Sequence, residues 1–338
     1  MKKKIVLLLQ GGGALGAFQC GAWQAILPFI RENGHELVAV AGASIGALNA
    51  SLIARHFHGP GGGVGVLQDF WRKTLANPPV PFFRMPGEYW WAWNGLLTNL
   101  LFGNHALFSP AYQHWNLVGD LFRFYMPLYL THRTERTMSD MVGEYRGTMP
   151  LLAVALTDVE SGEMRLVDSA SRSIVPKMLA ASIAIPLLFS PVDIDGRYYW
   201  DGEMRSNTLL PDVLALLQSL SDPEDAPADY LVIVVDMFQS AADRPPTSMV
   251  QSQYRFLSIL MGGKLDYDRR IFDAGNTLLD GMERLRRPGD ETGSPLAAAI
   301  EEEYRKARAL QHARVELLHI GRQQFPYEHI SRDFDYSP

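Results

Sequence analysis

A serine between two glycines is the first feature of the sequence that could do chemistry. Gly42-Ala-Ser44-Ile-Gly46 lies between an apolar run at 37–41 and a run with helical spacing at 45–55. Between a strand and a helix, a Gly-x-Ser-x-Gly pattern predicts a sharp turn that exposes the serine hydroxyl at the carboxyl edge of a sheet. The glycines would let strand and helix approach closely, and the helix would direct its positive end at the reacting centre. We therefore predict that Ser44 is a nucleophile.

A glycine run earlier in the chain could stabilise the charge that acyl transfer generates. Gly11, Gly12 and Gly13 follow the apolar run 4–9 and precede a stretch with helical spacing. Backbone N–H groups that no side chain covers can donate to a tetrahedral oxyanion, and loss of one such donor typically costs about 3 kcal/mol. We predict that these three glycines form an oxyanion hole.

The same glycines also fit the dinucleotide-binding pattern, as Gly11-x-Gly13-x-x-Gly16. That pattern requires an acidic residue at the end of the second strand to bind ribose. Residues 41–44, where the second strand should end, contain neither Asp nor Glu. The sequence therefore favours acyl transfer over an oxidoreductase, and we expect no cofactor.

The serine also needs a base. Asp201 follows the apolar and aromatic run 192–200 and precedes Gly202. An aspartate with an ordinary pKa of about 3.9 is a weak base, so its site would have to exclude water and raise its proton affinity. From the local sequence alone, an ordinary turn residue is the better interpretation of Asp201.

The elements that must position these residues alternate between strand and helix. Apolar runs at 4–9 and 37–41 are typical of strands buried on both faces of a parallel sheet, and residues 14–33 and 45–55 have helical spacing. This order predicts an α/β sheet with right-handed crossovers. Further strands are predicted at 151–157, 165–167, 192–200 with a turn at Asp195-Gly196, 231–236 and 315–320, and a further helix at 296–313.

Composition excludes several classes of protein. The 338 residues are 47% apolar and carry a net charge of −6, which allows a large core and argues against nucleic acid as a partner. The lone Cys20 cannot form an intrachain disulfide. No run approaches the roughly 18 apolar residues of a membrane span, and the run after the first lysines is too short for a signal peptide. We expect a cytoplasmic protein, with peripheral membrane contact left open.

Four blocks of sequence, taken together, resemble the bacterial patatin-like phospholipases. The blocks run in that family's order: Gly11-Gly-Gly-Ala-Leu-Gly-Ala-Phe-Gln, Gly42-Ala-Ser-Ile-Gly-Ala-Leu-Asn, Ala181-Ser-Ile-Ala-Ile-Pro186 and Asp201-Gly. The resemblance spans about residues 4–237 and implies a three-layer α/β/α fold with a mainly parallel sheet. It also implies hydrolysis of acyl esters in lipids by a Ser44–Asp201 dyad that uses neither a catalytic histidine nor a metal.

On this interpretation, residues 1–240 form the catalytic domain, with an insert or cap at about 60–135. A mostly helical extension, 241–338, would pack on it. The insert is rich in aromatic residues, among them Trp71, Trp90, Trp91, Trp93 and Trp115. Because tryptophan favours membrane interfaces, the insert could rest on lipid or cap the site. An ordinary core beneath a long insertion explains the aromatic residues equally well.

The chain departs from the family at two positions. Many relatives have Arg or Lys where this sequence has Leu15, and most have Gly or Ala where it has Glu203. A carboxylate two residues after Asp201 could raise the pKa of the base, or could point to solvent. It also leaves open an inactive relative that binds lipid or a protein partner.

Other arrangements of functional residues are weaker alternatives. A Ser-Asp-His triad could use one of three late histidines, but in α/β-hydrolases the nucleophile follows several strands, whereas Ser44 follows only the second. His56 and His58 have too few companions for zinc, and the acidic run 222–225 is interpreted as a solvated loop. The three late histidines are His312, His319 and His329. Head group, acyl length and oligomeric state stay open.

Overall fold

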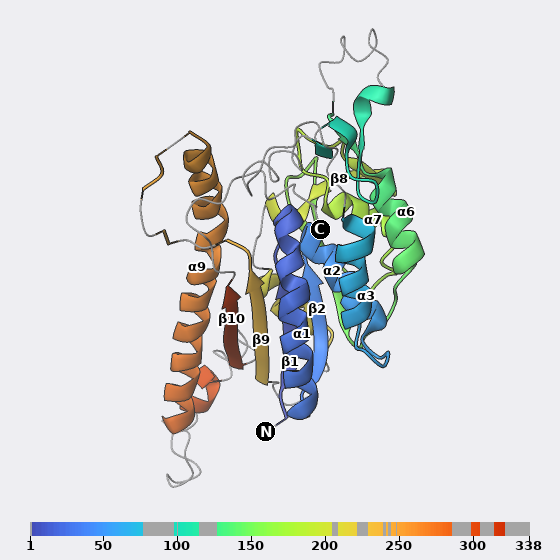
Figure 1. Ribbon diagram of the computed structural model, residues 1–338. Helices are drawn as coiled ribbons and strands as arrows, with labels where there is room; N and C mark the ends of the chain where they lie inside the picture. Colours follow the sequence, from blue (N-terminus) through green and yellow to red (C-terminus); the bar gives the residue numbers. More distant parts are fainter. Residues whose placement is uncertain are drawn as a thin grey trace.

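The computed structural model has a central sheet with helices on both faces (Figure 1). It describes residues 2–76, 98–99, 101–114, 127–204, 209–221, 229–238, 241–242, 245–247, 249–285, 299–304 and 314–321. Within these ranges the sheet runs in the order β10-β9-β1-β2-β5-β8-β7, and β6 also pairs with β5. The strands are β1 (Lys4–Leu9), β2 (Glu36–Gly42), β5 (Leu151–Asp158), β6 (Met164–Asp168), β7 (Val192–Ile194), β8 (Arg197–Asp201), β9 (Asp229–Asp236) and β10 (Arg314–Gly321).

The sheet is parallel over its larger part. Strands β10, β9, β1, β2 and β5 pair in parallel, while β6 and β8 pair antiparallel with β5, and β7 pairs antiparallel with β8. The central strands are buried along nearly their whole length, which explains their continuous apolar sequences. The prediction of a mainly parallel sheet is confirmed.

Two cores lie on opposite faces of this sheet. Leu7 and Leu9 of β1 belong to a core shared with α1 (Ala17–Glu32), α2 (Ile45–His56), α3 (Val64–Asp69) and α7 (Pro176–Ser182), against which α6 (His132–Met141) also packs. Val6 and Leu8 belong to a second core shared with α8 (Leu210–Ser219) and α9 (Met249–Leu285). Because successive side chains of β1 point to opposite faces, this strand packs against both helical layers. This arrangement confirms the three-layer α/β/α fold.

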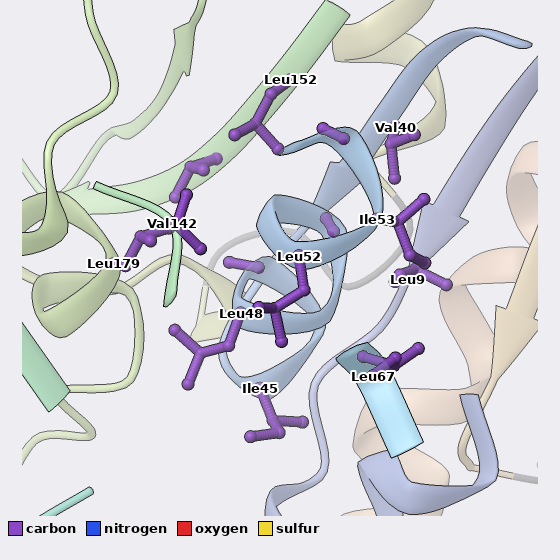
Figure 2. Packing of buried hydrophobic residues seen from close by; sticks show 14 of the residues in the cluster. Leu9, Val40, Ile45, Leu48, Leu52, Ile53, Leu67, Val142, Leu152 and Leu179 are labelled. Carbon is purple, nitrogen blue, oxygen red and sulfur yellow. The ribbon is translucent and has the colours of Figure 1, made fainter. Parts of the chain in front are cut away.

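Helix α2, which follows the candidate nucleophile, lies at the centre of the larger core. Every residue of α2 from Ile45 to Ala54 is buried. Figure 2 shows Leu48 and Leu52 of this helix among apolar side chains that come from β1, β2, α3, β5 and α7. Full burial of each such leucine stabilises the fold by about 1.5–3 kcal/mol. The first turn of α2 is therefore held firmly in place.

Gly46 lets α2 touch β1, and alanine there should weaken the fold. A Cβ on Gly46 would overlap the Leu9 carbonyl oxygen and lie 2.6 Å from the Gln10 carbonyl oxygen. Backbone atoms cannot rotate aside, so Gly46→Ala is expected to lower the free energy of unfolding by about 3 kcal/mol, measured by urea denaturation. Gly21→Ala is the matched control, because a Cβ on Gly21 of α1 meets nothing within 4 Å. Equal stability of Gly46→Ala and wild type would contradict this contact.

Several boundaries differ from those predicted. The segment expected to be one helix over 14–33 begins instead with a 3-10 turn, η1 (Gly13–Gly16), in which the Leu15 N–H donates to the Gly12 carbonyl oxygen at 3.1 Å. Over 192–200 the structure has two strands around the Asp195-Gly196 turn, which confirms that prediction. Helix α9, of 37 residues, was not predicted as a single element. Only 299–304 of the expected helix 296–313 lies among the described residues.

The C-terminal extension adds strand β10 to the edge of the sheet beside β9. The division into a catalytic domain at 1–240 and an extension at 241–338 stays a prediction. Trp90, Trp91, Trp93 and Trp115 of the insert lie outside the described residues. Of the helices that are described, none is both long and apolar enough to cross a bilayer.

Candidate active site

Ser44 occupies a strained turn between β2 and α2. Its backbone angles are φ 53° and ψ −134°, a conformation that non-glycine residues seldom adopt. Its N–H donates to Ser182 Oγ at 3.1 Å, and Ser182 Oγ–H donates in turn to the Ala155 carbonyl oxygen at 3.0 Å. Hydrogen bonds to α7 and from α7 to β5 thus hold the turn in its strained conformation, with the side chain of Ser44 at the end of β2.

Two glycines make the turn sterically possible. A Cβ on Gly42 would overlap the Gly46 carbonyl oxygen and lie 2.6 Å from the Ala47 nitrogen. The strand before Ser44 and the helix after it therefore touch through backbone atoms alone. This is the geometry in which a nucleophile stands at the N-terminus of a helix, although Ser44 is buried here, with 4% of its surface exposed, and not exposed as the sequence predicted.

Asp201 reaches the same place from β8. Its N–H donates to the Ala184 carbonyl oxygen at 3.0 Å, and its own carbonyl oxygen accepts a hydrogen bond from Thr157 Oγ1 at 2.9 Å. The side chain is almost fully buried, with Oδ1 accepting the Glu203 N–H at 2.9 Å and Oδ2 without a hydrogen-bond partner. The carboxyl group is therefore fixed at one oxygen and open to a proton at the other.

Burial controls the proton affinity of this carboxyl group. Desolvation raises the pKa of Asp201 to about 7, while the Glu203 N–H and the Ser44 hydroxyl act in the lowering direction. The Ser44 hydroxyl is thus close enough to interact with the carboxyl group, although Oδ2 has no partner in strict hydrogen-bond geometry. Catalytic hydrogen bonds commonly tighten only when substrate binds. The structure places the two residues together.

This pKa gives a testable pH dependence. If Asp201 acts as a base, only its ionised form is active, so kcat/KM should fall about tenfold per pH unit below pH 7 and level off above it. The measurement is kcat/KM for a neutral ester between pH 5 and 9, with uncatalysed hydrolysis subtracted. A profile that is flat from pH 5 to 9 would show that a group of this pKa is not the base.

The glycine loop lies beside Ser44 and is held by buried amide side chains. Gly12 and Gly13 have φ values of 140° and 57°, which only glycine adopts readily. Gln10 accepts the Met237 N–H at its Oε1 at 3.0 Å, and its carbonyl oxygen accepts a hydrogen bond from Gln19 Nε2 at 2.5 Å. The residue before the loop is therefore fixed from two sides.

Asn49 of α2 fixes the other end of the loop. Its Nδ2 donates to the Gly16 carbonyl oxygen at 3.1 Å and to Gln19 Oε1 at 2.7 Å, and its Oδ1 accepts from Trp71 Nε1 at 3.0 Å. No role was predicted for Asn49, Gln19 or Ser182. All three lie inside the sequence blocks quoted above, and this was the only signal that could have pointed to them.

Glu203 turns toward the site. A Cβ on Gly11 would overlap Glu203 Oε2, and it would lie 2.6 Å from Glu203 Cδ and 2.6 Å from Ser44 Cβ. The sequence left open whether Glu203 points to solvent. In the structure its carboxyl group lies beside Ser44 instead.

The histidine alternative finds no support in this geometry. His319 lies on β10 and its Nε2 is 3.0 Å from Asp236 Oδ2, whereas β9 and β1 separate β10 from β2. His312 and His329 lie outside the described residues. Among the described residues, Asp201 is the carboxyl group that interacts with the Ser44 hydroxyl.

The ring nitrogens of His56 and His58, which the sequence gave too few companions for zinc, face backbone carbonyl oxygens. His56 Nε2 lies 3.1 Å from the Met141 carbonyl oxygen, and His58 Nε2 lies 2.7 Å from that of Met149. Over the described ranges, no group of three or more His, Cys, Asp or Glu residues could hold a metal ion. The acidic run 222–225 lies outside these ranges.

Comparison with known proteins places the chain in a family. A search of solved structures matches VipD from Legionella pneumophila, with 14% sequence identity and a TM-score of 0.37. The match covers 99% of this chain and 66% of that one, just under two thirds. No curated protein matches the sequence. The family model for patatin-like phospholipase matches residues 7–214, a range that includes the glycine loop, Ser44 and Asp201. The chain belongs to the patatin-like phospholipase family.

Proposed function

We propose that this protein hydrolyses acyl esters of lipids, with Ser44 as nucleophile and Asp201 as base. Family membership supports lipid acyl hydrolysis in general terms. The observation that carries the specific proposal is a buried carboxyl group with a pKa of about 7 beside a serine hydroxyl on a strained turn. At neutral pH such a group is part ionised and can both accept and return a proton.

The reaction would proceed in two steps. In the first, Ser44 Oγ attacks the ester carbonyl carbon while its proton passes to Asp201 Oδ2, the oxygen that has no hydrogen-bond partner. The carbonyl oxygen becomes an oxyanion, which N–H groups of Gly11, Gly12 and Gly13 would stabilise. Collapse of this intermediate breaks the ester bond, and the leaving alcohol takes the proton from Asp201.

Water completes the cycle. Asp201 removes a proton from a water molecule, which attacks the acyl-enzyme at the same carbonyl carbon. The second tetrahedral intermediate releases the fatty acid, and the proton returns to Ser44 Oγ. The helix dipole of α2 favours negative charge at this point in both steps, because Ser44 stands at the helix N-terminus.

Active-site labelling tests the proposal. A fluorophosphonate probe should modify folded wild-type protein, and peptide mass spectrometry should locate the adduct at Ser44. Incubation with vesicles of mixed phospholipids should release free fatty acid, quantified by mass spectrometry. Protein that stays folded and is not labelled at Ser44 would favour the second candidate, a catalytically silent relative, for which the place of Glu203 beside the nucleophile is the specific argument.

Peripheral membrane contact is part of the proposal. Exposed apolar side chains come from the described part of the insert and from the turn after α7, and Leu187 is 88% exposed. The two segments are joined, since the Leu128 N–H donates to the Leu188 carbonyl oxygen at 3.0 Å. Weaker sedimentation of Leu187→Ser than of wild type with phosphatidylcholine vesicles would support this contact, and equal sedimentation would remove it.

A further inference from the structure

The position of Glu203 goes beyond the assignment of nucleophile and base. Glu203 lies in the short turn η4 (Gly202–Met204) directly after the base, and its N–H binds Asp201 Oδ1 at 2.9 Å. This turn directs the side chain back across the site toward Gly11. A single point beside Gly11, where a Cβ would be, is overlapped by Glu203 Oε2 and lies 2.6 Å from Ser44 Cβ. The Glu203 carboxyl group, the glycine loop and Ser44 therefore lie around one small space.

A substrate needs that same space. To react, an ester carbonyl carbon must come within about 3–3.5 Å of the nucleophilic oxygen. Its oxygen must at the same time face the N–H groups of the glycine loop. The Glu203 carboxyl group lies beside Gly11 and close to Ser44, so an ester carbonyl that approaches both would have to enter the space that this carboxyl group fills.

We propose that Glu203 is a specificity-determining residue whose carboxylate occupies the acyl-carbonyl position and must be displaced by substrate. This inference rests on the proposed function and extends it to the choice of substrate. Displacement costs binding energy that is the same in the ground state and the transition state, so it raises KM and leaves kcat nearly unchanged. The displaced carboxylate stays near the bound acyl group and disfavours acyl groups that carry a negative charge.

Two variants separate the space that Glu203 fills from its charge. Glu203→Gly removes both, whereas Glu203→Gln keeps the shape and removes the charge. Glu163→Gln is the matched control, because it changes net charge equally at an exposed hairpin. The substrates are 4-nitrophenyl hexanoate and the mono-4-nitrophenyl ester of adipic acid, which have equal acyl length but differ by a terminal carboxylate.

For the neutral ester, Glu203→Gly should lower KM about tenfold with kcat within about twofold of wild type. Both Glu203 variants should raise kcat/KM for the adipate ester, relative to the hexanoate ester, by about fivefold to tenfold, and Glu163→Gln should leave that ratio unchanged. If neither KM nor the ratio changes in either Glu203 variant, the proposal is overturned.

The fluorophosphonate probe separates this inference from the function it rests on. Faster labelling of Ser44 in Glu203→Gly than in wild type supports a carboxylate that blocks the site. If wild type and Glu203→Gly are labelled at equal rates and have the same KM, the proposed role of Glu203 is overturned, but the proposed hydrolase function is not. If neither folded protein is labelled, the proposed hydrolase function is overturned, and so is the role of Glu203, which depends on that function.

Discussion

Replacement of Ser44 by alanine is expected to reduce kcat for ester hydrolysis by roughly four to six orders of magnitude, to the residual rate that the oxyanion hole and substrate binding still support. The acyl-enzyme cannot form without Oγ, whereas the backbone contact that holds the turn, from the Ser44 N–H to Ser182 Oγ, remains in the variant. Activity should be measured with 4-nitrophenyl hexanoate, together with fatty acid release from phospholipid vesicles.

A glycine variant at the same position provides the control for folding. Ser44 has φ 53°, a value that costs a residue with a Cβ about 1 kcal/mol relative to glycine. Ser44→Gly should therefore be inactive like Ser44→Ala but more stable by about 1 kcal/mol in urea denaturation. Residual activity of either variant above about a tenth of wild type would exclude Ser44 as the nucleophile.

Asp201→Asn is expected to lower kcat by about three to four orders of magnitude and, at pH 8, to stabilise the fold. The amide can still accept the Glu203 N–H through Oδ1, so the turn should persist, but it cannot take the proton of Ser44. Loss of activity combined with a gain in stability distinguishes a base held in a costly environment from a residue that merely supports structure.

The sign of the stability effect follows from the pKa. In the fold the pKa of Asp201 is raised from 3.8 to about 7, so between these values the folded protein retains a proton that the unfolded chain has lost. Its contribution is therefore most favourable below about pH 4 and is lost as the pH rises to about 7. At about 1.4 kcal/mol per pH unit, the cost at pH 8 is about 4 kcal/mol.

Urea denaturation of wild type and Asp201→Asn at pH 5 and pH 8 checks this expectation. The variant should gain stability over wild type mainly at pH 8, because the wild-type carboxyl group is largely protonated at pH 5. Wild type that is more stable than the variant at both pH values would show that the carboxylate is not buried at a cost.

Local patterns predicted the strands of the main sheet and helices α1 and α2, but not the helices α3, α6, α7, α8 and α9. The first strand was predicted at 4–9 and β1 extends over those residues, because an uninterrupted apolar run has few alternatives in an α/β protein. The turn at Ser44 is also local, since it depends on glycines two residues away on each side. Asp201 was different, because only the family resemblance gave it a role that its own neighbours did not indicate.

The missed residues depend on contacts between distant parts of the chain. Asn49 and Gln19 are fully buried and bind each other and the loop, but a polar side chain in a helical segment gives no sign of such partners. The direction of Glu203 was left open for the same reason. It depends on the space that Gly11 leaves in the loop after β1, and no pattern within residues 200–205 indicates that space.

The strand order bears on how the protein could be shortened. The segment matched by the family model stops at residue 214, but β9 (Asp229–Asp236) lies between β1 and β10 in the sheet. Cutting the gene after that segment would uncover the main-chain N–H and C=O groups of β1, and cutting after 240 would uncover those of β9. Open edges of this kind recruit other chains and lead to aggregation. A soluble fragment for crystallisation should therefore extend at least through Gly321, the last residue of β10.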